Sequence, residues 1–286
     1  MIHTSRQLKD LVRNKSNGDS KKAQVYIRIY CMERFLERLT LSEYRDNFIL
    51  KGGMLVSSMI GIDRRATMDI DTTIQGKNLS VDDARVIISE IIAVPLDDGI
   101  TFELKDVYEI MEEAEYSGVR IMLSAQLDSM RTPVKIDIST GDAITPKEIR
   151  YSYKLMFEDR EIELLSYNLP TILAEKTETV ISRGTANTRL RDFYDIYTLC
   201  EQYLDRIDWS VVSDALDATS KKRGSEAVLK DAALITGELR DDSGMRSQWM
   251  NYQKKNDYAQ DITWDDAIDV LFELLRKIDL TDEGDH

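Results

Sequence analysis

The sequence changes character near Pro170, and this change limits the folds that are open to the chain. Before Pro170, short stretches alternate apolar and polar residues as β-strands do, and a few helical patterns lie between them. After it, helical patterns follow one another almost without interruption. We therefore predict an α+β domain over residues 1–166 and an α-helical bundle over residues 167–286.

The expected elements follow from the spacing of the apolar residues. The predicted helices of the first domain cover residues 24–39, 54–62 and 80–94. Its predicted strands cover residues 48–51, 67–74, 100–110, 118–127, 132–139 and 161–167. The predicted helices of the second domain cover residues 169–184, 189–204, 209–219, 225–239, 243–255 and 265–278. Residues 281–286 are expected to form a frayed acidic tail.

The composition excludes several kinds of site. The two histidines, His3 and His286, lie at the ends of the chain, which excludes a histidine-built zinc site or a Ser-His-Asp triad. The two cysteines, Cys31 and Cys200, fall in helical patterns, which argues against a disulfide framework and for a cytoplasmic protein. No stretch approaches the roughly 20 apolar residues of a membrane span, so no membrane partner is expected. Catalysis would therefore depend on carboxylates, lysines and arginines.

The net charge of −14 bears on the possible partners. A protein that holds nucleic acid by its overall field is usually basic, so this chain would need a local basic patch for that purpose. Arg183, Arg189 and Arg191 could contribute to such a patch. The aromatic and basic stretch 249–258 could stack bases, but an ordinary amphipathic helix explains it better.

Two aspartates stand one residue apart in the apolar stretch "MDIDTTI", residues 68–74. On a strand Asp69 and Asp71 point to one face, because side chains alternate. Two carboxylates 4 Å apart repel by about 4 kcal/mol at an effective dielectric constant near 20. Water, a basic neighbour or a bound cation must offset this repulsion.

The stretch "VKIDIS" repeats the pattern, with Lys135 and Asp137 on one face of a predicted strand. If this strand neighbours the first, Asp137 can join Asp69 and Asp71. Hard divalent ions such as Mg²⁺ prefer oxygen ligands and often bind substrate phosphates as well. The alternative is that each aspartate is simply solvated on an open face of the sheet, and the D-x-D pattern alone favours neither interpretation.

Two further features fit a site for phosphates. Lys51, Gly52 and Gly53 form a strand-to-helix turn, where glycines permit close approach and free amides attract anions. Such a turn more often has no ligand. Lys176 falls in the middle of an apolar helical stripe, where it would either reach a triphosphate, pair with an acid, or extend past its neighbours to water.

Asp192 and Asp195 lie one turn apart on the predicted helix 189–204. Their expected face differs from the buried stripe, and Arg189 and Arg191 flank them. For this segment in isolation, a solvated acidic face paired with arginines is the favoured interpretation.

Taken together, "LKGGMLVSSMIGIDRRATMDIDTTI", "VKIDIS" and "SYNLPTILAEKTETVISRGTANTRLRDFYDIYTL" resemble the AbiEii/AbiGii toxin family over residues 47–200. The family comprises nucleotidyltransferase-like toxins of toxin–antitoxin and abortive-infection (phage-defence) systems. The resemblance implies a mixed sheet with helices, like that of polymerase-β-type nucleotidyltransferases, followed by a helical C-terminal bundle. It implies as metal-binding catalytic carboxylates Asp69, Asp71 and Asp137.

The resemblance also implies roles for the other candidate residues. Lys176 would be a nucleotide-binding lysine, and Asp192 or Asp195 the late catalytic aspartate. Together with Lys176, the expected nucleotide-binding residues are Lys51, Gly52, Gly53 and Arg65. Arg65 would contact substrate or support the turn.

The chain departs from the family at Met54. Many members have Ser or Thr directly after the two glycines, where a hydroxyl can contact a phosphate. With methionine there, the phosphate-binding turn is expected to use backbone amides alone.

The function implied is transfer of a nucleotide from an NTP to an RNA acceptor, the tRNA 3′ end, with two Mg²⁺ ions or with Mn²⁺ in their place. A cognate antitoxin encoded alongside is the expected protein partner. Two alternatives remain open, an antibiotic-modifying nucleotidyltransferase and a non-catalytic relative that only binds a partner.

Overall fold

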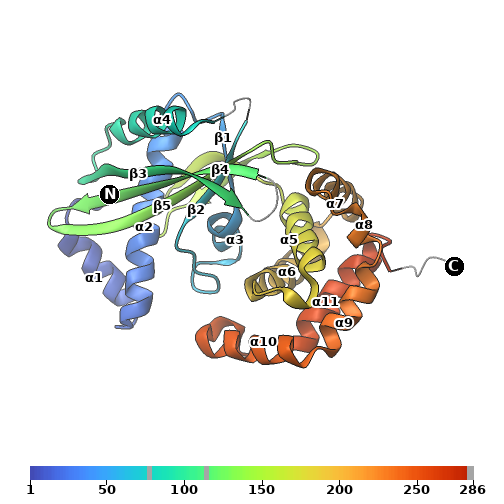
Figure 1. Ribbon diagram of the computed structural model, residues 1–286. Helices are drawn as coiled ribbons and strands as arrows, with labels where there is room; N and C mark the ends of the chain where they lie inside the picture. Colours follow the sequence, from blue (N-terminus) through green and yellow to red (C-terminus); the bar gives the residue numbers. More distant parts are fainter. Residues whose placement is uncertain (76–78, 113–115, 282–286) are drawn as a thin grey trace. The chain divides into compact units, whose positions relative to one another are not determined.

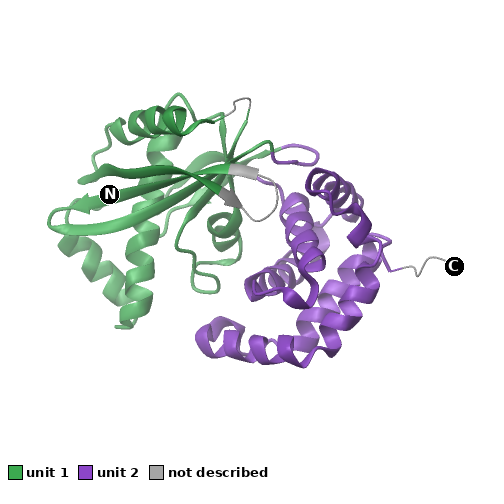
Figure 2. Cartoon of the chain, in the orientation of Figure 1, with its two compact units in different colours: residues 1–141, 148–166 green, residues 142–147, 167–286 purple. Residues whose placement is uncertain are grey.

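The computed structural model describes residues 1–75, 79–112 and 116–281 (Figure 1). The chain divides into two compact units, coloured separately in Figure 2. Unit 1 comprises residues 1–141 and 148–166, and unit 2 comprises residues 142–147 and 167–286. One passage of the chain between the units thus follows residue 166, and the short segment 142–147 also belongs to unit 2. The predicted tail lies outside the described residues except for Thr281.

Unit 1 is built on a mixed seven-stranded sheet with helices packed against it. The strand order is β3-β4-β5-β2-β1-β7-β6. The strands are β1 (Phe48–Lys51), β2 (Ile70–Ile74), β3 (Ile100–Glu112), β4 (Tyr116–Leu127), β5 (Met130–Thr140), β6 (Ile149–Lys154) and β7 (Glu161–Ser166). The helices are α1 (Ser5–Lys15), α2 (Ser20–Leu41), α3 (Gly52–Ile60) and α4 (Val81–Ala93). The expected α+β fold class is confirmed.

The two central strands β2 and β5 are amphipathic, and this property orients the sheet. Ile70 and Ile136 are completely buried and Ile138 nearly so. Because side chains alternate, Asp71 and Asp137 project from the opposite face. Helix α2 packs against β5 and β7, and α4 against β3, so helices and strands share one apolar core.

Three parts of unit 1 differ from the prediction. Strand β2 begins at Ile70 rather than at residue 67, and the Thr67 hydroxyl donates to Asp69 instead, 3.2 Å from Oδ1. Helix α1 was not predicted, because only Leu8 and Val12 are buried along it and the apolar stripe is narrow. Strand β6 was also missed. It is one of the two edge strands and is mostly exposed, so its sequence lacks a clear apolar face.

Unit 2 is helical. Its helices are α5 (Leu169–Arg183), α6 (Leu190–Tyr203), α7 (Trp209–Arg223), α8 (Glu226–Leu229), α9 (Ala232–Asp241), α10 (Ser243–Lys255) and α11 (Trp264–Lys277). Short 3₁₀ turns are η1 (Gly184–Ala186), η2 (Leu204–Arg206) and η3 (Asp257–Ala259). The helix predicted over 225–239 is divided into α8 and α9. Lys230, the C-cap residue of α8, keeps helical dihedral angles, φ −63° and ψ −25°. The break is therefore slight, and the apolar spacing on which the prediction rests does not reveal it. Within the described residues, no helix has both the length and the apolar character needed to cross a membrane.

A network of buried charges joins α2 to the segment between β6 and β7. Arg34 is completely buried, with Nη1 2.7 Å from Glu37 Oε2 and 3.1 Å from Glu158 Oε1. Glu33, also completely buried, accepts a hydrogen bond of 3.0 Å from the backbone N–H of Met156. Burial raises the pKa of Glu33 to about 8, against the opposing effect of Arg34.

We predict that the stability of unit 1 in Glu33→Gln, relative to the wild type, increases as the pH rises, because the wild type loses stability and the variant does not. Between an unfolded pKa near 4.5 and a folded pKa near 8, the folded state of the wild type binds more protons. Rising pH therefore lowers its free energy of unfolding, by about 2 kcal/mol between pH 6 and 8, and a glutamine removes this contribution.

Pulse alkylation of Cys31 measures this difference, since Cys31 is buried in unit 1 and Cys200 in unit 2. The wild-type to variant ratio of Cys31 labelling rates should rise about 30-fold between pH 6 and 8, and the ratio for Cys200 should stay constant. A Cys31 ratio that is independent of pH would contradict an elevated pKa at Glu33.

Candidate active site

The register of five neighbouring strands places a row of polar side chains across one face of the sheet. Lys51 on β1 is opposite Asp71 on β2, which is opposite Asp137 on β5. Asp137 is in turn opposite Arg120 on β4, and Arg120 is opposite Tyr108 on β3. Residues directly opposite on neighbouring strands share a face, so two carboxylates lie side by side between two basic residues.

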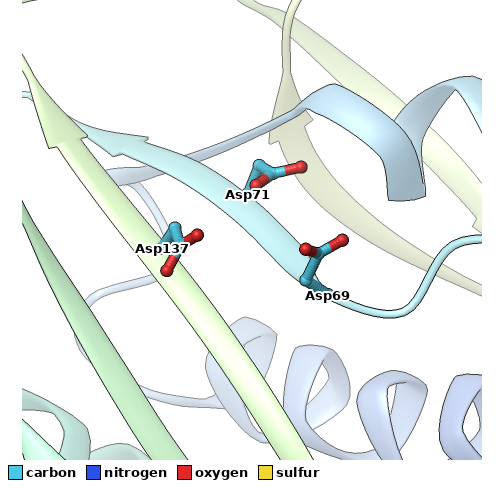
Figure 3. Close-up of side chains that lie close together, drawn as sticks. All are labelled: Asp69, Asp71 and Asp137. Atoms are coloured by element: carbon cyan, nitrogen blue, oxygen red, sulfur yellow. The ribbon is translucent and has the colours of Figure 1, made fainter. Parts of the chain in front are cut away.

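Asp69 completes a group of three carboxylates. One oxygen from each of Asp69, Asp71 and Asp137 can be chosen so that all three lie within 4.8 Å of one another. In Figure 3 the three side chains lie together, two on neighbouring strands and Asp69 directly before β2. Burial, with the nearby charges of Asp69 and Asp137, raises the pKa of Asp71 to about 6. The repulsion expected from the sequence is therefore visible in the structure.

Basic side chains offset part of this repulsion. The ammonium of Lys135 lies 2.6 Å from Asp69 Oδ2 and 3.5 Å from Asp137 Oδ2. Arg120 donates to both oxygens of Asp137, from Nε at 2.7 Å and from Nη2 at 2.8 Å. The sequence left water, a basic neighbour or a bound cation as ways to offset the repulsion, and the structure shows basic neighbours.

Sequence reasoning missed Arg120 and gave no role to Lys135. The pairing of β4 with β5 brings Arg120 to Asp137, and nothing local in the sequence indicates that register. Lys135 was expected on the same face as Asp137, which the structure bears out. Its position between Asp69 and Asp137 depends on how β2 and β5 pair.

Gly52 and Gly53 bring the start of α3 against the carboxylates. Gly52 has φ +62°, and a Cβ added to it would lie 2.3 Å from Asp71 Oδ2. The backbone N–H of Gly53 donates to the same oxygen at 3.2 Å. One of the helix-start amides expected to attract phosphate is therefore already bonded to Asp71. Lys51 belongs to this turn as the N-cap residue of α3.

Arg65 supports the turn from the interior. It is only 3% exposed, and its Nη1 donates to the carbonyl oxygen of Gly53 at 3.1 Å. A Cβ added to Gly53 would lie 2.6 Å from both Arg65 Nη1 and Thr67 Oγ1. Of the two predicted roles for Arg65, the contacts match that of supporting the turn.

No hydroxyl near the glycines replaces the one that Met54 removes, among the described residues that follow in α3. Met54 is 1% exposed and belongs to the core. Ser57 is buried and donates to the carbonyl oxygen of Arg65, while Ser58 donates to that of Leu55 at 2.7 Å. This arrangement agrees with a turn that would offer backbone amides to a ligand.

A small pocket adjoins the carboxylates within unit 1. It is open to solvent and is lined in part by Lys51, Asp71, Asp137, Gly118 and Ser139. The last two residues leave space because neither has a large side chain. The space inside it is about that of a single water molecule, far below the roughly 300 Å³ of a ligand pocket, so it would hold only one small group of a ligand.

Unit 2 holds the remaining predicted site residues in one cluster. The ammonium of Lys176 on α5 lies 2.7 Å from Asp192 Oδ1 and 2.6 Å from Asp195 Oδ2, both on α6. Asp195 is completely buried, and the side chain of Asp192 is 15% exposed. The interpretation of these aspartates as a solvated acidic face is therefore wrong. Pairing with an acid, one of the alternatives for Lys176, is what unit 2 shows.

The candidate RNA-binding residues lie in unit 2 as well. Arg189 and Arg191 are exposed near the start of α6, and Arg183 is half-buried at the end of α5. Trp249, by contrast, is 1% exposed and donates from its indole nitrogen to the carbonyl oxygen of Ile262 at 2.8 Å. The tryptophan is a core residue, as the amphipathic-helix interpretation predicts.

The residues of unit 1 fit a divalent metal ion by their chemistry. Three carboxylates supply oxygen ligands of the kind that Mg²⁺ and Mn²⁺ prefer, and they converge on one point. Burial is the main cause of the raised pKa of Asp71, and the charges of Asp69 and Asp137 add to it, so a cation bound there would favour the ionised carboxylate.

Comparison with known proteins identifies the family. The family model described as nucleotidyl transferase AbiEii toxin of type IV toxin–antitoxin systems matches residues 34–270. The chain belongs to the AbiEii toxin family. The match spans the carboxylates of unit 1 and the Lys176 cluster of unit 2 of this AbiEii-family protein, and it confirms the resemblance seen in the sequence.

Two solved structures from Helicobacter pylori are similar to this AbiEii-family chain in fold. One, described as a candidate nucleotidyltransferase, has a TM-score of 0.52 at 16% identity and covers 92% of this chain and 98% of its own. The other, JHP933, has a TM-score of 0.53 at 16% identity and covers 89% of this chain and 91% of its own. A comparison with curated proteins gives no match.

We predict that Gly52→Ala destabilises unit 1 by about 3 kcal/mol, because alanine is strained at φ +62° and its methyl group would collide with Asp71. Alkylation of Cys31 should accelerate about 100-fold under native conditions, and alkylation of Cys200 should not change.

Gly224→Ala is the matched control. Gly224 has φ +66° in unit 2, with open space where a Cβ would be. This variant should cost about 1 kcal/mol and should accelerate the labelling of Cys200 alone. If the two substitutions destabilise their own units equally, the collision with Asp71 is not the main cause of the destabilisation by Gly52→Ala.

Proposed function

We propose that the protein transfers a nucleotide from an NTP to an RNA acceptor, the 3′ end of tRNA, with Mg²⁺. The observation that carries the proposal is the convergence of Asp69, Asp71 and Asp137 beside a glycine turn in a chain of this family. Three carboxylates so close together favour a divalent cation, and phosphate transfer is the chemistry that such a group serves most often.

In this proposal Asp69, Asp71 and Asp137 hold Mg²⁺, with Mn²⁺ as a substitute. The metal, when bound, would neutralise phosphate charge and make the acceptor hydroxyl more acidic. Gly52 and Gly53 let the backbone approach the ligand, and Lys51 adds a positive charge on the same row as Asp71. Arg120 fixes the orientation of Asp137 through two hydrogen bonds.

The reaction forms one bond and breaks one. The acceptor hydroxyl oxygen bonds to the α-phosphorus of the NTP, and the bond from that phosphorus to the bridging oxygen breaks. Pyrophosphate leaves with the electron pair, and the hydroxyl proton passes to a base, for which Asp137 is the candidate. Because no covalent intermediate is required, the residues act by positioning and by neutralising charge.

Lys176 is proposed to neutralise the β- and γ-phosphates, and Asp192 or Asp195 to act as the late catalytic carboxylate. The ion pairs of Lys176 with Asp192 and Asp195 in unit 2 give the proposal a specific form, since they orient the ammonium. A phosphate oxygen would then compete with the partly exposed Asp192 for the ammonium.

An RNA acceptor fits the exposed Arg189 and Arg191 and the partly exposed Arg183, which could contact a phosphate backbone. The net charge of −14 requires that such contact be local. The type IV toxin–antitoxin family implies an antitoxin as the protein partner.

The test is transfer of label from each NTP, labelled at its α-phosphate, to total tRNA with Mg²⁺. We predict that Asp71→Asn lowers the transfer at least about 100-fold, since it removes a charge that the proposed metal requires. Asp97→Asn, which removes an aspartate charge from a side chain that is 99% exposed in the same unit, should keep wild-type transfer.

Wild-type transfer by Asp71→Asn would overturn the proposed metal site. Parallel incubations with aminoglycosides separate the acceptors. Transfer to an aminoglycoside with none to tRNA would retain nucleotidyl transfer and overturn the RNA acceptor.

A further inference from the structure

Lys135 stands out among the basic residues around the carboxylates. Its ammonium lies between Asp69 Oδ2, at 2.6 Å, and Asp137 Oδ2, at 3.5 Å. These two aspartates, with Asp71, are the group whose oxygens converge. The ammonium is thus a single positive charge set among the oxygens that a divalent ion would use.

Arg120 differs from Lys135 in how firmly it is held. Arg120 makes two parallel hydrogen bonds to Asp137, one to each oxygen, and a planar guanidinium fits this arrangement closely. Lys135 is a compact charge on a flexible four-carbon chain, and its ammonium lacks the fixed planar geometry of a guanidinium. The two side chains are about equally exposed, 30% for Lys135 and 31% for Arg120, so the difference lies in how each is bonded. Lys135 can therefore swing into water without disturbing the strand, whereas Arg120 is fixed.

We propose that Lys135 is an internal counter-cation that occupies the carboxylate group in the metal-free protein and is displaced when a divalent ion binds. The inference rests on the proposed metal site and adds a residue that controls access to it.

Simple electrostatics supports an exchange rather than coexistence. A divalent ion held by Asp69 and Asp137 would repel an ammonium in contact with the same oxygens, with twice the force of a single charge at that distance. Asp137 can keep Arg120, because each carboxylate oxygen accepts more than one interaction. The ion pair between Lys135 and Asp69 is the contact that must break. Once released, the ammonium is free to pair with a phosphate oxygen of the substrate.

The test is Mn²⁺ binding to the full chain, measured by calorimetry without nucleotide. Lys135→Met should bind Mn²⁺ about tenfold more tightly than the wild type, because the competing charge is gone. The matched control is Lys105→Met, since Lys105 is another strand lysine of unit 1, with an acid partner, Glu103, at 2.5 Å. Its affinity for Mn²⁺ should equal that of the wild type. Unchanged or weaker binding by Lys135→Met would overturn the proposal.

A second measurement needs no variant. Acylation of lysines in the wild type, followed by mass spectrometry, should show Lys135 reacting about fivefold faster with Mn²⁺ present, as its ion pair with Asp69 is broken. Lys105 should react at the same rate with and without the ion. A rate at Lys135 that Mn²⁺ leaves unchanged or lowers would contradict displacement.

Asp71→Asn separates this proposal from the metal site beneath it. If Asp71→Asn binds Mn²⁺ as the wild type does, the ion lies elsewhere and the proposed function fails with its metal site. If Asp71→Asn loses Mn²⁺ while Lys135→Met shows no gain, the metal site stands and the role of Lys135 is wrong.

Discussion

The parallel pairing of β2 with β5 is the constraint on which the candidate site depends. It aligns Asp71 with Asp137, so that two carboxylates must share one point of the sheet. The two strands that flank this pair each place a basic residue next to a carboxylate, Lys51 on β1 and Arg120 on β4. Apolar residues on the reverse face, such as Ile70 and Ile136, are completely buried and fix the register, because a slip by one residue would turn the aspartates into the apolar core.

The sequence anticipates much of this arrangement, because it depends on local alternation. A period of two in "MDIDTTI" and "VKIDIS" correctly separates the charged face from the apolar face of β2 and β5. The change of pattern near Pro170 correctly separates a mixed sheet from helices. The glycine turn is likewise visible locally, although its reason, close contact with Asp71, is not.

What the sequence misses depends on pairing between distant segments. Arg120 reaches Asp137 only because β4 pairs with β5, and no short pattern encodes that register. Asp195 is completely buried and pairs with Lys176, which lies on another helix. The pattern of α6 alone does not reveal this partner, so it wrongly predicts an exposed aspartate. Charged residues on a helix usually face water, and tertiary pairing overrides this preference here.

We propose that Asp69, Asp71 and Asp137 form a cation site, because the basic residues beside them neutralise only part of their charge. Anomalous diffraction at the manganese edge, from crystals of the full chain grown with Mn²⁺ and a non-hydrolysable NTP analogue, tests it most directly. The account predicts an anomalous peak in contact with an oxygen of each of the three aspartates, with Lys135 no longer paired with Asp69. A peak elsewhere, with the ammonium of Lys135 still between Asp69 and Asp137, would contradict it.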